Sequence, residues 1–263
     1  MAETVDVTAV GGNRRSRWRR AGVAVTALLL AAAAPDARQA ASAPARGDAH
    51  DGARGAAVSG QISLVERPGA GQCDVRSAVV YLESTSRAVH DSAADSALLD
   101  ATIAMRGREF VPHVRTVLAG GTVTFPNRDP FSHNVFSNAA PGPFDLGLYR
   151  RGRSRSATFP RAGVYPIYCN IHSKMVSFVV AVPTPYVAQA GSDGRFSIDG
   201  APPGDYVLHV WHECAGAEVR REITIPEGGL SGVRIVLDAR AYVAAPHLNK
   251  FGLPYTATRA DRY

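Results

Sequence analysis

The stretch GVYPIYCNIHSKMVSFVVAV, residues 163–182, decides the fold class of this chain. Apolar residues alternate with polar or small ones on both sides of a short polar segment. This period of two is typical of β-strands rather than helices. We therefore expect a strand from Val164 to Cys169, a turn-rich loop, and a second strand from Val176 to Val182. Because the same pattern continues outward in both directions, the sequence predicts an all-β protein.

Further strands are predicted wherever short alternating runs lie between turn residues. These runs are residues 60–65, 78–83, 101–105, 115–118, 122–125, 133–136, 156–159, 195–198, 206–211, 218–225 and 233–237. Residues 88–100 fit a short helix or a connecting loop equally well, and we find no other candidate helix. The predicted architecture is therefore built from strands joined by turns.

Composition and charge exclude two classes of protein. The chain has 263 residues, of which 46% are hydrophobic and 20% charged, so wholesale disorder is excluded. The formal net charge of +6 is local, since residues 98–182 hold 10 basic and 4 acidic residues whereas residues 56–97 and 183–263 together hold 11 basic and 14 acidic ones. Aromatic residues do not interleave with the basic ones as in strands that stack bases, so we expect no nucleic-acid partner.

The N-terminal region has the pattern of an export signal. A cluster of arginines precedes an apolar, acid-free run at residues 21–34, which is shorter than the ~20 residues that span a bilayer. We expect residues 1–34 to be a signal peptide and residues 35–55 a flexible tether. The mature chain has no later candidate transmembrane segment, and we expect it to be periplasmic or secreted.

Three soft donor residues lie three positions apart in the central loop. Cys169, His172 and Met175 offer a thiolate, an imidazole and a thioether, and His133 in FPNRDPFSHNVFS offers a second imidazole. Two His and one Cys with a weak axial Met form the blue-copper electron-transfer geometry. Taken singly, such residues are more often core or surface residues, but the joint pattern favours copper. Zinc is disfavoured because Met is not among its usual ligands.

The segments FVPHVRTVLAGGTVTFPNRDPFSHNVFS, residues 110–137, and FPRAGVYPIYCNIHSKM, residues 159–175, resemble the cupredoxins, the plastocyanin and amicyanin group. The resemblance covers residues 98–182 and implies a Greek-key β-sandwich with one type 1 copper per chain. It implies His133, Cys169 and His172 as ligands, with Met175 as the axial ligand.

The resemblance also implies roles for neighbouring residues and for the whole chain. Asn134 would tie the ligand loops together by hydrogen bonds near the thiolate, and His172 would be the electron port. The protein would carry single electrons between redox partners and would not be an enzyme. The alternatives are a cell-envelope binding module with a structural copper site, and a protein of copper storage or delivery.

The flanking sequence suggests a second, smaller sandwich. GRFSIDGAPPGDYVLHV, residues 194–210, resembles the later strands of transthyretin-like, carboxypeptidase-regulatory-type modules, and SGQISL and SAVVYLE, residues 59–64 and 77–83, resemble their opening strands. We expect one discontinuous sandwich from residues 56–88 and 186–240, with the copper domain inserted and residues 241–263 as a C-terminal tail. Two tandem units are the alternative.

Two cysteines remain once Cys169 is assigned to copper. In an oxidising compartment Cys73 and Cys214 are expected to pair as a disulfide. His113 is expected to have a packing or surface role, because four ligands are already present.

A basic run suggests the kind of redox partner. It comprises Arg150, Arg151, Arg153 and Arg155, with Lys174 inside the ligand loop. A solvated charge run is the ordinary explanation, and docking of an acidic redox partner is the alternative.

Overall fold

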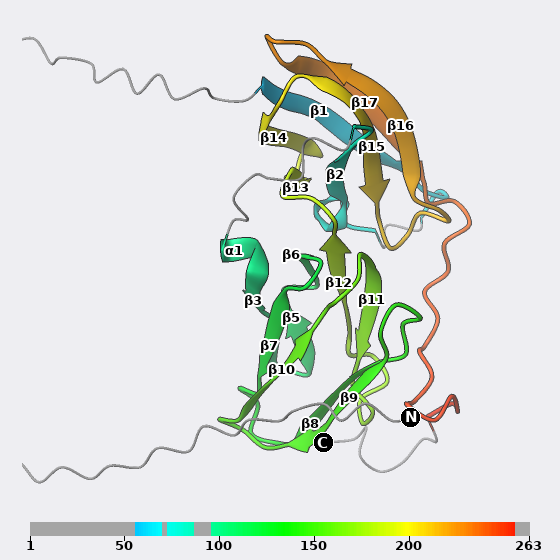
Figure 1. The fold of residues 1–263 in the computed structure, drawn as a ribbon. Coiled ribbons are helices and arrows are strands. Elements are labelled where there is room, and N and C mark those ends of the chain that lie inside the picture. The colour runs from blue at the N-terminus through cyan, green and yellow to red at the C-terminus, as the bar shows by residue number, and fades with distance from the viewer. Residues whose placement is uncertain (1–55, 70–72, 87–95, 256–263) are drawn as a thin grey trace, which may run out of the picture. The chain divides into compact units, whose positions relative to one another are not determined.

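The computed structural model describes residues 56–69, 73–86 and 96–255, and these are almost entirely β-structure (Figure 1). The all-β prediction is confirmed. The predicted signal peptide and tether lie outside the described residues. Within the described part of the chain, no helix is long and apolar enough to cross a membrane.

The two ends of the described chain form one sandwich, which we call the flanking sandwich. Its sheets have the strand orders β14-β1-β17 and β13-β2-β15-β16. The strands are β1 (Ala56–Val65), β2 (Val79–Ser84), β13 (Val187–Gln189), β14 (Arg195–Ala201), β15 (Gly204–Trp211), β16 (Val219–Ile225) and β17 (Leu230–Asp238), with a 3₁₀ turn η1 (Val75–Ser77) before β2. Strand β1 pairs antiparallel with β14 and parallel with β17.

The middle of the chain forms a second sandwich, the central sandwich. Its sheets have the orders β10-β7-β3 and β6-β12-β11-β8-β9, and β4 and β5 form a hairpin. The elements are α1 (Ser96–Leu99), β3 (Asp100–Thr102), β4 (Ala104–Arg106), β5 (Glu109–Val111), β6 (Val114–Leu118), β7 (Thr122–Pro126), β8 (His133–Ser137), β9 (Phe144–Tyr149), β10 (Ser154–Thr158), β11 (Gly163–Tyr168) and β12 (Val176–Val182).

Strand β12 is buried on both faces, which explains its continuous apolar sequence. Val179 and Ala181 belong to the core of the central sandwich. The alternate residues Val180 and Val182 pack with Val79 of β2 in a separate cluster. Because successive side chains of a strand point to opposite faces, one strand serves both clusters.

Each sandwich has its own hydrophobic core. A disulfide within the flanking sandwich and a polar contact between the two sandwiches add to these cores. The flanking core gathers residues of β1, β2, β14, β15 and β17, and the central core gathers residues from β3 to β12. Cys73 and Cys214 form a disulfide within the flanking sandwich. His113 lies in the central part of the chain and Glu213 follows β15. Nε2 of His113 and Oε1 of Glu213 are 2.6 Å apart.

Candidate metal centre

The ligand loop, residues 169–175, connects two paired strands. Tyr168 at the end of β11 is paired with Val176 at the start of β12. Inside the loop, the Cys169 N–H donates to the Met175 carbonyl at 3.3 Å and the Met175 N–H donates to the His172 carbonyl at 3.1 Å. The loop is therefore closed on itself by backbone hydrogen bonds, so its side chains are held at fixed positions.

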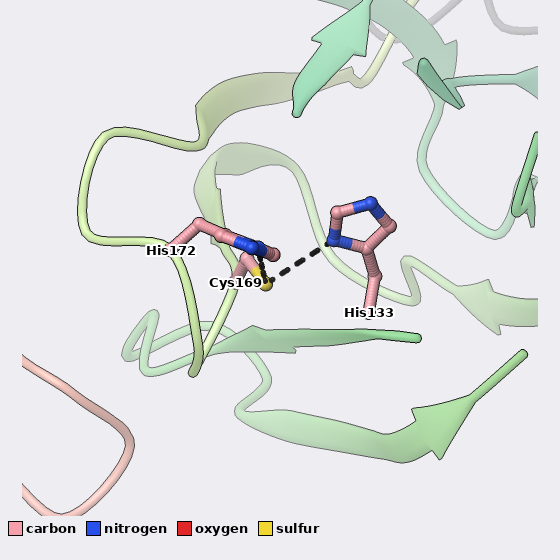
Figure 2. A group of neighbouring side chains, drawn as sticks. All are labelled: His133, Cys169 and His172. Atoms are coloured by element: carbon pink, nitrogen blue, oxygen red, sulfur yellow. Dashed lines mark hydrogen bonds between the residues drawn. The ribbon is translucent and has the colours of Figure 1, made fainter. Parts of the chain in front are cut away.

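The structure brings three of the predicted donors together (Figure 2). Cys169 Sγ lies 3.8 Å from Nδ1 of His133 and 3.7 Å from Nδ1 of His172. The three donor atoms lie within 4.8 Å of one another. His133 is the first residue of β8 and is fully buried, whereas His172 is half-buried. Residues far apart in sequence thus converge on one point.

Met175 follows in the same loop, and its side chain is buried beside that of Cys169 in the central core. A thioether is a weak donor on a flexible apolar chain, and burial here keeps it out of contact with water. The structure therefore places the predicted axial residue in the core of the central sandwich rather than at its surface.

The surroundings of Cys169 shift the pKa of its thiol in opposite directions. Burial raises the pKa of the thiol, while backbone N–H groups of Asn134, Ile171 and His172 lower it. Burial is the larger influence, so without a metal the thiol is protonated at neutral pH. Metal binding must release this proton, and the three N–H groups are then available to stabilise the thiolate.

A carboxylate orients the ring of His133. Nε2 of His133 donates to Asp129 Oδ2 at 2.8 Å, and Asp129 is held in turn by the N–H groups of Gly107 at 2.6 Å and Arg108 at 2.9 Å. Burial lowers the pKa of His133 and outweighs the opposing influence of Asp129. The imidazole is therefore neutral, with its proton on Nε2, which leaves the Nδ1 lone pair directed at the thiol.

Phe131 covers the two imidazoles. Its ring centroid lies 5.1 Å from that of His133 and 5.6 Å from that of His172, and the guanidinium of Arg108 lies 5.2 Å above the ring. The sequence analysis did not identify Phe131, Asp129 or Arg108. Asp129 and Phe131 lie four and two residues before His133 in the same quoted segment, but nothing in their residue types marks them out.

Asn134 hydrogen-bonds to the Cys169 thiol through its backbone N–H, while its side chain is directed elsewhere. The side-chain amide donates to Asp145 Oδ1 of β9 at 2.6 Å, and its Oδ1 atom is buried with no hydrogen-bond partner among the described residues. Only its backbone N–H faces the thiol. The side chain of Asn134 therefore has no direct contact with the ligand loop among the hydrogen bonds of the described residues, and its polar partner is Asp145.

The other predicted residues lie outside the metal centre. Arg150, Arg151 and Arg153 are exposed at the β9–β10 turn, and Lys174 is exposed in the ligand loop. Arg155 differs, because it is half-buried with its guanidinium 5.2 Å above the ring of Tyr149 and hydrogen-bonded to the Leu146 carbonyl. The exposed part of the basic run is therefore the turn itself.

The donor set fits copper. The sulfur–nitrogen separations of 3.8 and 3.7 Å would leave room for one ion bound by all three donor atoms. Two Nδ1 atoms, one thiolate and a buried thioether nearby make up a soft set that suits copper. His133, Cys169 and His172 would hold the ion, with Met175 as the fourth, weaker donor.

Comparisons with known proteins give similarities to cupredoxins over part of the chain. A purple cupredoxin from Nitrosopumilus maritimus is 25% identical and aligns over 32% of this chain and 100% of its own, with a TM-score of 0.29. Amicyanin from Paracoccus versutus is 21% identical over 39% of this chain and 98% of its own, with a TM-score of 0.30. No family model and no curated protein matches the sequence.

Proposed function

We propose that this protein is an exported type 1 copper protein that carries single electrons between redox partners, with no enzymatic step. The observation that carries the proposal is the convergence of Nδ1 of His133, Sγ of Cys169 and Nδ1 of His172 within 4.8 Å. A bound copper ion would supply the one-electron couple between Cu(I) and Cu(II).

The residues around the site suit this role because they hold the donors in place. The hydrogen bond from His133 to Asp129 fixes one imidazole, and the closed ligand loop fixes the thiolate and the other. Donors held by the protein need little rearrangement when the charge of the site changes. Half-buried His172 is the donor nearest to solvent and is proposed as the electron port.

Storage or delivery of copper is the weaker alternative. Transfer of an ion to an acceptor requires donors that a second protein can reach. His133 and Cys169 are both 0% exposed, so an acceptor cannot reach them without opening the site. Their burial supports electron transfer, which needs only proximity, over exchange of the ion.

Export is supported by the disulfide in the flanking sandwich. The Cys73–Cys214 disulfide is of a kind that forms and persists in oxidising compartments such as the periplasm or the exterior of the cell. Together with the basic and apolar N-terminal pattern, it favours a periplasmic or secreted protein.

The proposal is tested by the visible spectrum of the purified protein with added Cu(II). We expect an intense thiolate-to-copper band that is lost in Cys169→Ser, because an alcohol cannot replace the soft thiolate donor. Reversible bleaching by a reductant would then support electron transfer. A colourless wild-type protein, or a band that persists in the variant, would refute the proposed site.

A further inference from the structure

The C-terminal tail contacts the ligand loop. The hydroxyl of Tyr255 donates to the Cys169 carbonyl at 2.6 Å, and the backbone N–H of Lys250 donates to Asn170 Oδ1 at 2.9 Å. The ring of His247 stacks on Tyr168, with the centroids 4.3 Å apart and the planes 21° from parallel. Residues 247–255, which we call the strap, thus contact three consecutive residues centred on the ligand Cys169.

The strap also reaches the strands that carry the other imidazole. Nζ of Lys250 lies 2.7 Å from Asp145 Oδ2, and Asp145 Oδ1 accepts from the Asn134 side chain at 2.6 Å. Burial opposes ionisation of Asp145, yet the hydrogen bonds from Lys250 and Asn134 keep its pKa below the ordinary value. An ionised carboxylate between two donors makes charge-assisted bonds, which are stronger than neutral ones.

These contacts form one continuous connection between the two ligand-bearing segments. It runs from Asn134, next to His133, through Asp145 and Lys250 to Asn170, next to Cys169. The Asn134 side chain therefore reaches the ligand loop through the tail.

The strap is folded rather than extended. The side chain of Asn249 accepts from the N–H groups of Phe251 at 2.9 Å and Leu253 at 3.1 Å, and the Asn249 N–H donates to the Leu253 carbonyl at 2.8 Å. Yet Phe251 and Leu253 are 72% and 60% exposed. Polar contacts with the ligand loop, rather than burial of these apolar residues, hold the turn in place.

We propose that Lys250 and Tyr255 of the strap are positioning residues that hold the ligand loop and strand β8 at a fixed separation, and so keep the copper donors preorganised. The role in copper binding rests on the proposed function. The contacts between the strap and the ligand loop are also present in the apo-protein. Lys250 connects the two segments laterally, and Tyr255 holds the backbone of the thiolate ligand directly.

The test measures how readily the ligand loop opens in the apo-protein. Cys169 is the free cysteine, since Cys73 and Cys214 are paired, so its reaction with a disulfide reagent such as DTNB in native buffer reports loop opening. Loss of one hydrogen bond of about 1 kcal/mol makes opening about 5-fold more frequent. We therefore expect Tyr255→Phe and Lys250→Gln each to react about 5-fold faster than the wild type, and the double variant faster still.

Matched controls lie on the same tail. Tyr242→Phe removes a hydroxyl outside the strap, and Arg240→Gln removes an exposed cation that pairs with Asp238. Both controls should react at the wild-type rate. Asp145→Asn should accelerate the reaction as Lys250→Gln does, and combining the two should add little, because both break the same contact.

A second measurement distinguishes positioning of the copper donors by the strap from a general contribution of the strap to stability. In the copper-loaded protein, Tyr255→Phe and Lys250→Gln should shift the reduction potential or the copper EPR spectrum while the controls do not. Equal DTNB rates in the wild type and all strap variants would overturn the inference. If the strap variants react faster but the wild type forms no blue centre, the strap stands and the proposed electron-transfer function fails.

Discussion

Asp129 determines which nitrogen of His133 faces the thiol. Its carboxylate accepts the Nε2 proton at 2.8 Å and is itself fixed by two backbone N–H groups. A carboxylate that accepts from the far nitrogen of a ligand imidazole both orients the ring and increases its basicity. The residue would therefore act on a bound ion without contacting it.

Replacing this carboxylate should weaken metal binding. We expect Asp129→Asn to lower copper affinity about 10- to 100-fold, because an amide neither carries the charge nor fixes the proton of His133 on Nε2. Competition with a copper chelator measures the affinity. Asp199→Asn, a matched change at an exposed position of the flanking sandwich, should have no effect. Equal affinities in the Asp129 variant and the wild type would contradict the orienting role.

Some single residues could be predicted from the sequence, and others could not. Cys169 and His172 were identified because donor types at short spacing carry their own chemical signature, and His133 because a blue-copper site needs a second imidazole and the segment around it resembles the cupredoxins. Asp129 and Phe131 carry none, since an acidic or aromatic residue in a loop has many uses. Their roles follow from the fold of residues 127–133, where Asn127 donates to the Phe131 carbonyl and accepts from the Asp129 N–H.

Individual strands could be predicted where apolar residues alternate with polar or small ones without interruption. The ligand loop was expected between strands ending at Cys169 and beginning at Val176, and the structure has β11 ending at Tyr168 and β12 beginning at Val176. Strand β9 was missed because Gly147, with φ of 67°, interrupts its alternation and prolines precede it. Such a positive φ is a glycine conformation that ordinary strand patterns do not contain.

The other short strands were missed for a different reason. Strands β5 and β13 each have only three residues, too few for a period to be read. Residues 101–105 were predicted as one strand, but the structure divides this region between β3 and β4, which belong to different sheets. Of the segment 88–100, for which a short helix or a loop was expected, residues 88–95 lie outside the described residues and Ser96–Leu99 form α1.

The disulfide connects two segments of the flanking sandwich that are 141 residues apart in sequence. A cross-link that closes so long a loop stabilises by restricting the unfolded chain, typically by about 2 to 5 kcal/mol. We expect Cys73→Ala/Cys214→Ala to lower the free energy of unfolding of the flanking sandwich by this amount in urea titrations. The copper band should remain, because the metal centre lies in a sandwich with its own core.

Thiol titration provides the matching check on the pairing. The denatured but unreduced wild-type apo-protein should show one reactive thiol, that of Cys169, and three after reduction. Three reactive thiols before reduction would contradict the disulfide.

At the scale of the whole molecule, His113 and Glu213 connect the two sandwiches. The hydrogen bond with Glu213 raises the pKa of His113, although burial opposes the shift. A raised folded-state pKa stabilises the protein fully below the unfolded value of about 6.5, and the stabilisation is lost as pH rises through the folded value. His113 is 41% exposed, so the contribution should stay under about 1 kcal/mol.

The corresponding prediction concerns pH-dependent stability. We expect His113→Gln to be less stable than the wild type at pH 5.5, and the difference to shrink as pH rises to 8.5. Urea unfolding of the apo-protein at several pH values measures this difference. Glu213→Gln should behave in the same way, and the double variant should be no worse than either single one. A deficit that grows with pH would contradict the assigned direction.

The distribution of charge leads to a prediction about encounter rates. Residues 98–182 hold 10 basic and 4 acidic residues, and Arg151 and Arg153 are exposed at the β9–β10 turn. Attraction between exposed charges weakens as salt shortens the screening length, which is about 8 Å at physiological ionic strength. Oxidation of the Cu(I) protein by anionic ferricyanide should therefore slow with added salt.

Reversing the charge of the turn should remove much of this dependence. We expect Arg151→Glu/Arg153→Glu to flatten the salt dependence of the stopped-flow rate without changing the visible spectrum. Arg221→Glu/Arg234→Glu makes the same change of charge on the flanking sandwich and should leave the dependence nearly intact. If both pairs behave alike, only the net charge matters and the turn is not the site of approach.

The parallel pairing of β1 with β17 has a consequence for the order in which the chain can fold during synthesis. All strands of the central sandwich, and the four residues predicted to bind copper, have been made once Val182 has emerged. Strand β1 must then wait for β14, and for β17 as the last strand to be made, before both of its edges are paired. Until β17 has been made, β1 has an unpaired edge whose backbone N–H and C=O groups can pair with another chain. The growing chain can thus hold a folded central sandwich between the two unfinished halves of the flanking sandwich, before the strap has been made.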